Sequence, residues 1–256
     1  MKTFLGFDRP VITTMLKSRE PEALLKDIAA AISEGTDAFC LQIDTLQPKD
    51  RTAENFRTFF AAMGEKPAYI TNYSRGNVSE REQSDEELTE EMLLAMECGA
   101  TLFDVRGDLF DKRPDEMAVD EKAIEKQMAL IRQVHGMGGE VLISSHTLVY
   151  TPIGRVLEMA REQKRRGADI AKIVAAADTQ EQLDEAFETT IRLKRELGLP
   201  ALFLVGGTFS RLHRRVAPLM GSAVFLTTQD GYDGRLQPPM TIAKSIMLNA
   251  GISRLP

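Results

Sequence analysis

Cysteine is scarce in this sequence, which has only two, Cys40 and Cys98, in 256 residues. Two cysteines can build neither a disulfide framework nor a cysteine-rich metal cluster, so we expect a reducing compartment. Basic residues are also outnumbered by acidic ones, and the formal net charge is -6. A nucleic-acid-binding protein needs a basic face, so we expect no nucleic-acid partner.

Long apolar runs are absent as well. The N-terminal stretch MKTFLGFDRP has an apolar patch too short for a signal peptide, and no segment approaches the length of a membrane-spanning helix. No linker, low-complexity segment or internal repeat divides the chain. We therefore expect one soluble, cytoplasmic domain over residues 1–256, without a membrane partner and long enough to bury a full-sized core.

Strand-like and helix-like segments alternate along the whole chain. Eight alternations in about 250 residues favour the α/β class and a (β/α)8 TIM barrel. No Gly-rich nucleotide fingerprint follows the first strand, as an open dinucleotide-binding sheet would require. The predicted strands lie near 11–15, 38–43, 68–73, 101–106, 140–145, 169–174, 200–205 and 223–227, and the last helix lies near 239–250.

Several sequence signals mark the ends of the predicted helices. Ser84-x-x-Glu87 and Asp178-x-x-Glu181 are typical of capping boxes. Thr151-Pro152 predicts an N-cap followed by a proline at the first helical position. Glycine is typical just past a helix that turns back to a strand. The glycines expected in that position are Gly35, Gly99, Gly139, Gly167 and Gly198.

Two residues between 141 and 174 are hard to explain as structure alone. His146 stands where an apolar strand passes into a loop, and Lys172 lies inside a strand otherwise fit for burial on both faces. A buried ammonium is costly unless it is paired or its pKa falls. The alternatives are a lysine that snorkels to water and a histidine held by ordinary hydrogen bonds. Together, on consecutive parallel strands, the two residues suggest an imine-forming lysine beside an acid/base.

Other polar residues at strand ends allow both a structural and a functional interpretation. Asp44 and Asp104 lie at the ends of the second and fourth predicted strands, and Glu80 lies in a charged loop after the third. The basic cluster 210–215 is either a solvated helix face or a clamp for a carboxylate or phosphate. On the first interpretation its apolar stripe consists of Leu212, Val216 and Leu219. No spacing is typical of a zinc or EF-hand site, so no metal is expected.

These residues resemble the type I 3-dehydroquinate dehydratase family over nearly the whole chain. The segments SSHTLVYTP, GADIAKIV and RRVAPLMGSAVF carry the resemblance, together with Gln237 after the last strand. It implies a (β/α)8 barrel, usually a homodimer, that converts 3-dehydroquinate to 3-dehydroshikimate through a lysine imine. It also implies no metal or organic cofactor, and a place in the shikimate pathway that leads to aromatic amino acids.

The resemblance also implies a role for individual residues. Lys172 matches the imine-forming lysine and His146 the acid/base, while Glu80 matches the glutamate that partners the histidine. Arg214 matches the arginine that holds the carboxylate of the small-molecule substrate, with Arg211 as the alternative. Gln237 matches the loop glutamine that contacts the same end of the substrate.

The sequence departs from the family at other positions that would face the substrate. The second strand of the family typically reads Glu-x-Arg-x-Asp, whereas this chain has Cys40 and Gln42 in place of the charged pair. Tyr73 replaces an arginine, and Asp233 falls where a small hydroxyl residue is typical. Sites built around substrate hydroxyls discriminate strongly. The same dehydration of a different hydroxy-ketone therefore stays open, as do a metabolite-binding barrel without turnover and a barrel of unrelated chemistry.

Overall fold

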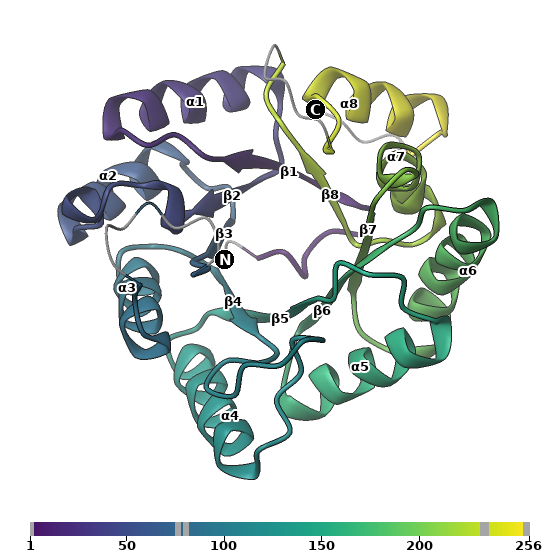
Figure 1. The fold of residues 1–256 in the computed structure, drawn as a ribbon. Helices are drawn as coiled ribbons and strands as arrows, with labels where there is room; N and C mark the ends of the chain where they lie inside the picture. Colours follow the sequence, from purple (N-terminus) through teal and green to yellow (C-terminus); the bar gives the residue numbers. More distant parts are fainter. Residues whose placement is uncertain (1–2, 75–77, 79–81, 231–235, 253–256) are drawn as a thin grey trace.

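The computed structural model of the protein describes residues 3–74, 78, 82–230 and 236–252. Eight parallel strands form a nearly closed barrel, and the helices form a ring around it (Figure 1). The strands are β1 (Val11–Leu16), β2 (Ala38–Gln42), β3 (Ala68–Thr71), β4 (Leu102–Arg106), β5 (Glu140–His146), β6 (Ile170–Ala176), β7 (Ala201–Gly206) and β8 (Val224–Thr227). The expected (β/α)8 TIM barrel is confirmed, and every predicted strand overlaps an observed one.

The helices follow the strands in chain order. They are α1 (Pro21–Glu34), α2 (Ala53–Ala62), α3 (Asp85–Glu97), α4 (Glu121–Gly136), α5 (Ile153–Arg166), α6 (Gln180–Glu196), α7 (Ser210–Met220) and α8 (Met240–Asn249). Two short 3-10 turns, η1 (Ile43–Thr45) and η2 (Pro48–Asp50), lie between β2 and α2. No helix in the described part of the chain is long and apolar enough to cross a bilayer.

Strand pairing sets the depth of the polar residues in the barrel. The hydrogen-bonded order runs from β8 through β1 to β7, and the described strands β7 and β8 form no ladder with each other. A backbone hydrogen bond from Ala223 to Ala201 (2.8 Å) joins these two strands near their starts. Between β5 and β6, Ser144 is in register with Lys172, and His146 with Val174. Lys172 is therefore two residues deeper in the barrel than His146.

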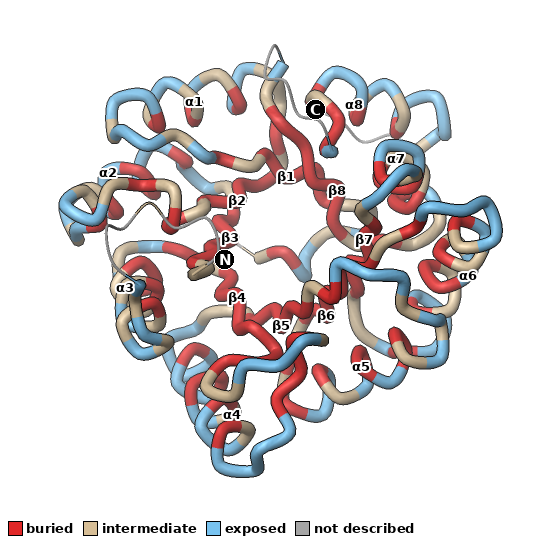
Figure 2. Tube along the Cα trace, in the orientation of Figure 1, coloured by how far each residue is buried: buried red, intermediate tan, exposed pale blue. Residues whose placement is uncertain are grey.

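Apolar side chains fill the space inside the strands as well as the layer under the helices. Figure 2 shows the strands as a buried ring and the helices as buried mainly on the sides that face it. The first described residues cross one end of the barrel, where the Phe4 ring packs edge-on against Tyr69 (centroids 6.4 Å apart). The Phe4 amide donates to the Glu140 carboxylate at 2.8 Å. Residues before β1 thus close the end of the barrel where the strands begin.

The helix-end signals are only partly confirmed. Gly35 and Gly167 cap α1 and α5 in the left-handed conformation, at φ 87° and 107°. After α4 the left-handed residue is Gly138 (φ 80°), one position earlier than predicted. Ser84 and Glu87 form the expected capping box of α3.

The predicted N-cap signals of α5 and α6 are wrong in detail. The capping box of α6 consists of Thr179 and Gln182, because the Asp178 carboxylate instead accepts hydrogen bonds from Thr208. Thr151 does not cap α5, which begins after Pro152 with no side-chain cap. A carboxylate oxygen of Glu185 accepts the hydrogen bond from the first amide of α5, at 2.7 Å.

The predicted apolar stripe of α7 is also wrong. Leu212 is 48% exposed and Leu219 is 39% exposed, whereas His213 and Arg214 are buried. The His213 ring stacks on Phe187 with centroids 5.3 Å apart. Because this imidazole, which also meets Phe203 at right angles, and the buried Arg214 guanidinium occupy the inner face, the leucines are left outside.

The buried histidine of α7 predicts a pH-dependent stability. Burial lowers the pKa of His213 to about 4, against an ordinary value of 6.5. The folded state therefore resists a proton that the unfolded chain accepts. The free energy of unfolding should fall by about 3 kcal/mol as the pH drops from 6.5 to 4, at about 1.36 kcal/mol per pH unit.

Urea unfolding of the wild type and of His213→Gln across this pH range checks the expectation. The variant lacks the titrating imidazole. The free energy of unfolding of the wild type minus that of the variant should therefore be constant above pH 7 and decrease as the pH falls towards 4. Slopes from carboxyl groups are common to both proteins and cancel in the difference. A difference that does not vary with pH would contradict the buried neutral histidine.

Candidate active site

Lys172 projects from β6 into the barrel, where polar groups surround its ammonium. It is 5% exposed. Its Nζ donates hydrogen bonds to the hydroxyls of Tyr69 (3.0 Å) and Tyr73 (2.9 Å) and to Oδ2 of Asp104 (3.3 Å). The surroundings of this amine are therefore polar, although its neighbours along β6 are apolar. The ammonium has three acceptors, one of them a carboxylate.

Asp104 is the counter-ion, and it lies in the middle of β4 rather than at the end of the strand. Its carboxylate accepts hydrogen bonds from Tyr69, from Tyr73 (2.6 Å) and from Ser144 (2.5 Å). Burial raises its pKa, but the Lys172 ammonium and the three hydroxyls outweigh burial, so its pKa lies below the ordinary value. Burial and the same carboxylate raise the pKa of both tyrosines well above the usual value, so both keep their protons.

His146 ends β5, and a glutamate from another loop holds it. Its Nδ1 lies 2.8 Å from Oε2 of Glu116, and its backbone N–H donates to the same oxygen at 2.7 Å. The Tyr73 ring packs edge-on against the imidazole (centroids 5.2 Å, interplanar angle 78°). Burial and the nearby Lys172 ammonium lower the pKa of His146 below 6.5, although Glu116 opposes them. The imidazole is therefore neutral at neutral pH.

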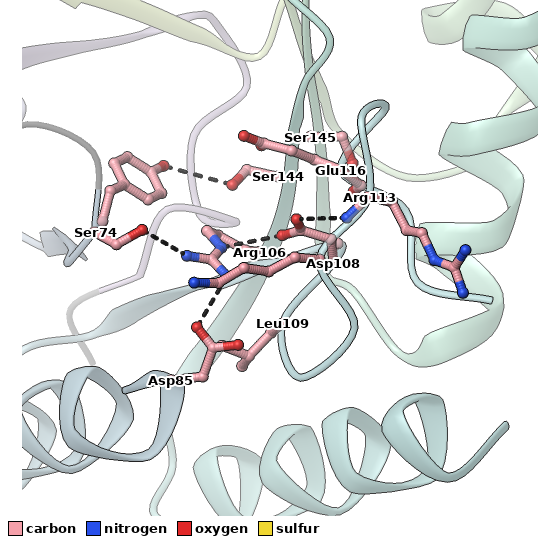
Figure 3. A network of polar contacts seen from close by, with 12 residues as sticks. Ser74, Asp85, Arg106, Asp108, Leu109, Arg113, Glu116, Ser144 and Ser145 are labelled. Carbon is pink, nitrogen blue, oxygen red and sulfur yellow. Dashed lines mark hydrogen bonds and ion pairs between the residues drawn. The ribbon is translucent and has the colours of Figure 1, made fainter. Parts of the chain in front are cut away.

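A cavity of about 270 Å³ opens beside the histidine. It is lined by Tyr73, Ser74, Arg106, Asp108, Lys112, Glu116 and His146. Figure 3 shows Arg106 held between Asp85 and Asp108, at nitrogen–oxygen distances of 3.0 and 3.1 Å. Burial lowers the pKa of Arg106, but these two carboxylates raise it by more, so its pKa lies above the ordinary value and the guanidinium stays charged. These two ion pairs fix the position of Arg106 in the wall of the cavity.

Arg214 and Gln237 meet at the strand ends of β7 and β8. The Arg214 Nε donates to the Val205 carbonyl at 2.9 Å. The Gln237 amide satisfies both neighbours when its nitrogen donates to the Leu226 carbonyl (3.3 Å) and its oxygen accepts from Arg214 Nη1 (2.5 Å). Burial lowers the pKa of Arg214 to about 10, and no carboxylate of the described residues pairs with it. Arg211 is exposed, so Arg214 is the better placed of the two arginines.

Three further residues singled out in the sequence lie on β2 or just after it. Gln42 ends β2 and is half-buried, and Asp44 follows in η1, where burial raises its pKa to about 6. Cys40 lies in β2, and burial raises the pKa of its thiol to about 12. Glu80 and Asp233 lie outside the described residues. Within the described residues, no three histidine, cysteine or acidic side chains gather as a possible metal site.

Three residues of the site were missed by sequence reasoning. Tyr69 could have been found, because strand alternation places it on the same face as Tyr73. Arg106 carried a weaker signal, as a charged residue at the end of a buried strand. Glu116 carried none, because it lies in a long loop and reaches His146 only through a left-handed backbone conformation (φ 49°).

The fold and these groups define the class of protein. A (β/α)8 barrel holds its functional groups at the carboxyl ends of its strands. His146 ends β5, Arg214 bonds to the end of β7, and Lys172 points into the same barrel from two residues deeper. The chain belongs to the type I 3-dehydroquinase family, whose model matches residues 12–241. This family consists of 3-dehydroquinate dehydratases, so the resemblance seen in the sequence is confirmed.

Solved structures with the same fold are similarly named. The 3-dehydroquinate dehydratase from Geobacillus kaustophilus is 18% identical, with a TM-score of 0.83 over 99% of this chain and 97% of that one. The type I enzyme from Clostridium difficile, solved with covalently modified comenic acid, is 16% identical, with a TM-score of 0.82 over 97% and 96%. At these identities the likeness shows the fold alone. No curated protein matches the sequence.

The ion pair inside the barrel predicts a large effect on stability. Lys172→Met leaves the Asp104 carboxylate buried without its cation, so it should lower the free energy of unfolding by about 3–5 kcal/mol. Adding Asp104→Asn removes the stranded charge and should restore part of the loss, with a coupling of about 0.5–3 kcal/mol.

Urea denaturation of the two single variants, the double variant and the wild type measures this coupling. The matched control is Lys126→Met, which breaks a surface pair with Glu86 and should cost less than about 1 kcal/mol. Strictly additive effects at Lys172 and Asp104 would show that the two groups do not depend on each other.

Proposed function

We propose that this protein is a lyase that removes water from a 3-keto cyclitol acid through an imine on Lys172, with 3-dehydroquinate as the family substrate. One observation carries the proposal. Tyr73 touches both candidate groups, with its hydroxyl 2.9 Å from the Lys172 amine and its ring against His146. The amine and the imidazole therefore border the same part of the barrel mouth.

The chemistry begins when the Lys172 ammonium passes a proton to the Asp104 carboxylate with which it is in contact. The free amine attacks the substrate ketone to give a carbinolamine. The same proton then returns to the carbinolamine hydroxyl, which leaves as water and yields a protonated imine. That cation withdraws electrons from the neighbouring carbon and makes its hydrogen acidic. His146 takes this proton and returns it to the departing hydroxyl, so a second water leaves. Hydrolysis of the imine restores the lysine, and one water is lost overall.

The second part of the site is a candidate for substrate binding. The Arg214 guanidinium is buried and cationic, and its described partners are neutral oxygens. A substrate carboxylate would supply the missing negative charge in the paired geometry that arginine favours. Gln237, which accepts from Arg214 Nη1, would hold the guanidinium in place beside the bound molecule.

A metabolite-binding barrel without turnover is the second candidate. One observation favours it: three acceptors already engage the Lys172 ammonium, and the cavity beside His146 is lined by Tyr73 rather than by the lysine. A resting ammonium in a complete set of contacts resembles a structural ion pair. Covalent trapping separates the two candidates.

Borohydride reduction in the presence of 3-dehydroquinate and related 3-keto cyclitol acids tests imine formation. We expect a stable adduct whose mass maps to the peptide that contains Lys172. His146→Ala should still form the adduct but lose roughly 10²–10⁴-fold in kcat, since it removes the proton-transfer group and not the nucleophile. An adduct on another lysine, or ligand binding with no adduct, would reject the lyase mechanism.

Arg214 should dominate the affinity for the carboxylate. Arg214→Ala removes a buried cation that faces a carboxylate, so kcat/KM should fall by a factor that corresponds to about 2–5 kcal/mol. The matched control is Arg211→Ala, which removes an exposed arginine from the first turn of the same helix. Steady-state kinetics on both variants give the comparison. A larger fall in kcat/KM for Arg211→Ala than for Arg214→Ala would assign carboxylate binding to Arg211 instead.

A further inference from the structure

We propose that Glu116 is the positioning residue of His146, which fixes the ring hydrogen on Nδ1 and leaves Nε2 to exchange protons with the substrate. This inference rests on the proposed function, which gives proton transfer to His146. It differs from the role implied by family resemblance, which fell on Glu80, a residue outside the described part of the chain.

The hydrogen-bond pattern determines the tautomer. A carboxylate only accepts hydrogen bonds, so the group 2.8 Å from Oε2 of Glu116 must be an Nδ1–H. The same oxygen accepts the backbone N–H of His146 at 2.7 Å. These two contacts hold both the ring and its backbone, because rotation of the ring would break one of them. Nε2 is then the nitrogen with the free lone pair, and it is the one able to act as a base.

The conformation of the loop between β4 and α4 places the Glu116 carboxylate beside His146. Glu116 adopts a left-handed conformation, and its carbonyl accepts a hydrogen bond from the Ser145 hydroxyl at 2.8 Å. The buried Arg166 guanidinium donates to the carbonyls of Gly107 (2.9 Å) and Ala118 (2.8 Å), on either side of the loop. A Cβ at Gly107 would collide with the Glu116 carbonyl. Glycine is therefore required where the loop closes over the strand end.

The groups around His146 determine the direction in which its pKa is shifted. Burial lowers its pKa most, and the Lys172 ammonium on β6 lowers it further. Glu116 from the β4–α4 loop and Asp104 on β4 oppose them, while Tyr73 after β3 contributes only a neutral ring edge. Loss of the Glu116 charge should therefore lower the pKa of His146 further and weaken it as a base.

Nitrogen-15 NMR of the imidazoles in the full-length protein tests the assignment. The chain has three histidines, so comparison with His146→Gln identifies the signals of His146. We expect the Nδ1–H tautomer in the wild type. In Glu116→Gln we expect a mixture of tautomers, a lower His146 pKa and a kcat reduced by roughly 10²-fold, at the lower end of what an acid/base group supplies. Glu116→Asp should keep the tautomer but lose part of the rate.

The matched control is Asp115→Asn, which removes the neighbouring carboxylate that pairs with Arg155 and should leave the His146 spectrum unchanged. An Nε2–H tautomer in the wild type would overturn the assignment, even if Glu116→Gln does not fold. A tautomer that shifts in Glu80→Gln but not in Glu116→Gln would also overturn it. An Nδ1–H tautomer without any borohydride adduct would support the assignment while rejecting the lysine imine, because the spectrum does not depend on turnover.

Discussion

The contact between Lys172 and Asp104 is the constraint around which the barrel interior is arranged. An ammonium and a carboxylate inside a protein persist only when each is paired and hydrogen-bonded. Here two tyrosines and Ser144 complete the pair from three further positions. This requirement explains why polar aromatic residues lie beside the pair, in a barrel whose interior also holds a large apolar cluster. The same group that costs most to bury is the one best placed for imine chemistry.

Much of the fold could be predicted from the sequence because it depends on local rules. Strand positions follow apolar runs, and glycines such as Gly35 and Gly167 end helices in a conformation that disfavours other residues. The face of α7 could not be predicted in this way. Hydrophobic periodicity assigned its leucines to the core, but His213 and Arg214 have specific partners on neighbouring elements, and those partners outweigh the apolar pattern.

The candidate site was likewise predictable from the sequence only in part. Lys172 and His146 were identifiable because a charged residue in an apolar strand and a histidine at a strand end are unusual. Their environment was not identifiable, because it comes from residues far apart in the chain. Tyr69 reaches Lys172 across 103 positions, and Glu116 depends on a left-handed turn that no short motif specifies. Side-chain type thus indicates where chemistry is possible, whereas long-range contacts determine its form.

The first residues of the chain have a consequence for the order of assembly. Phe4 and its neighbours close one end of the barrel by contacts with Glu140, which lies 136 positions later. The partners His146 and Glu116 are only 30 positions apart. Because closing a longer loop costs more entropy, contacts between near neighbours are favoured early and distant ones late. The histidine and its glutamate can therefore meet while the barrel is still half built. The lysine gains its full set of partners only when β3, β4 and β6 have come together.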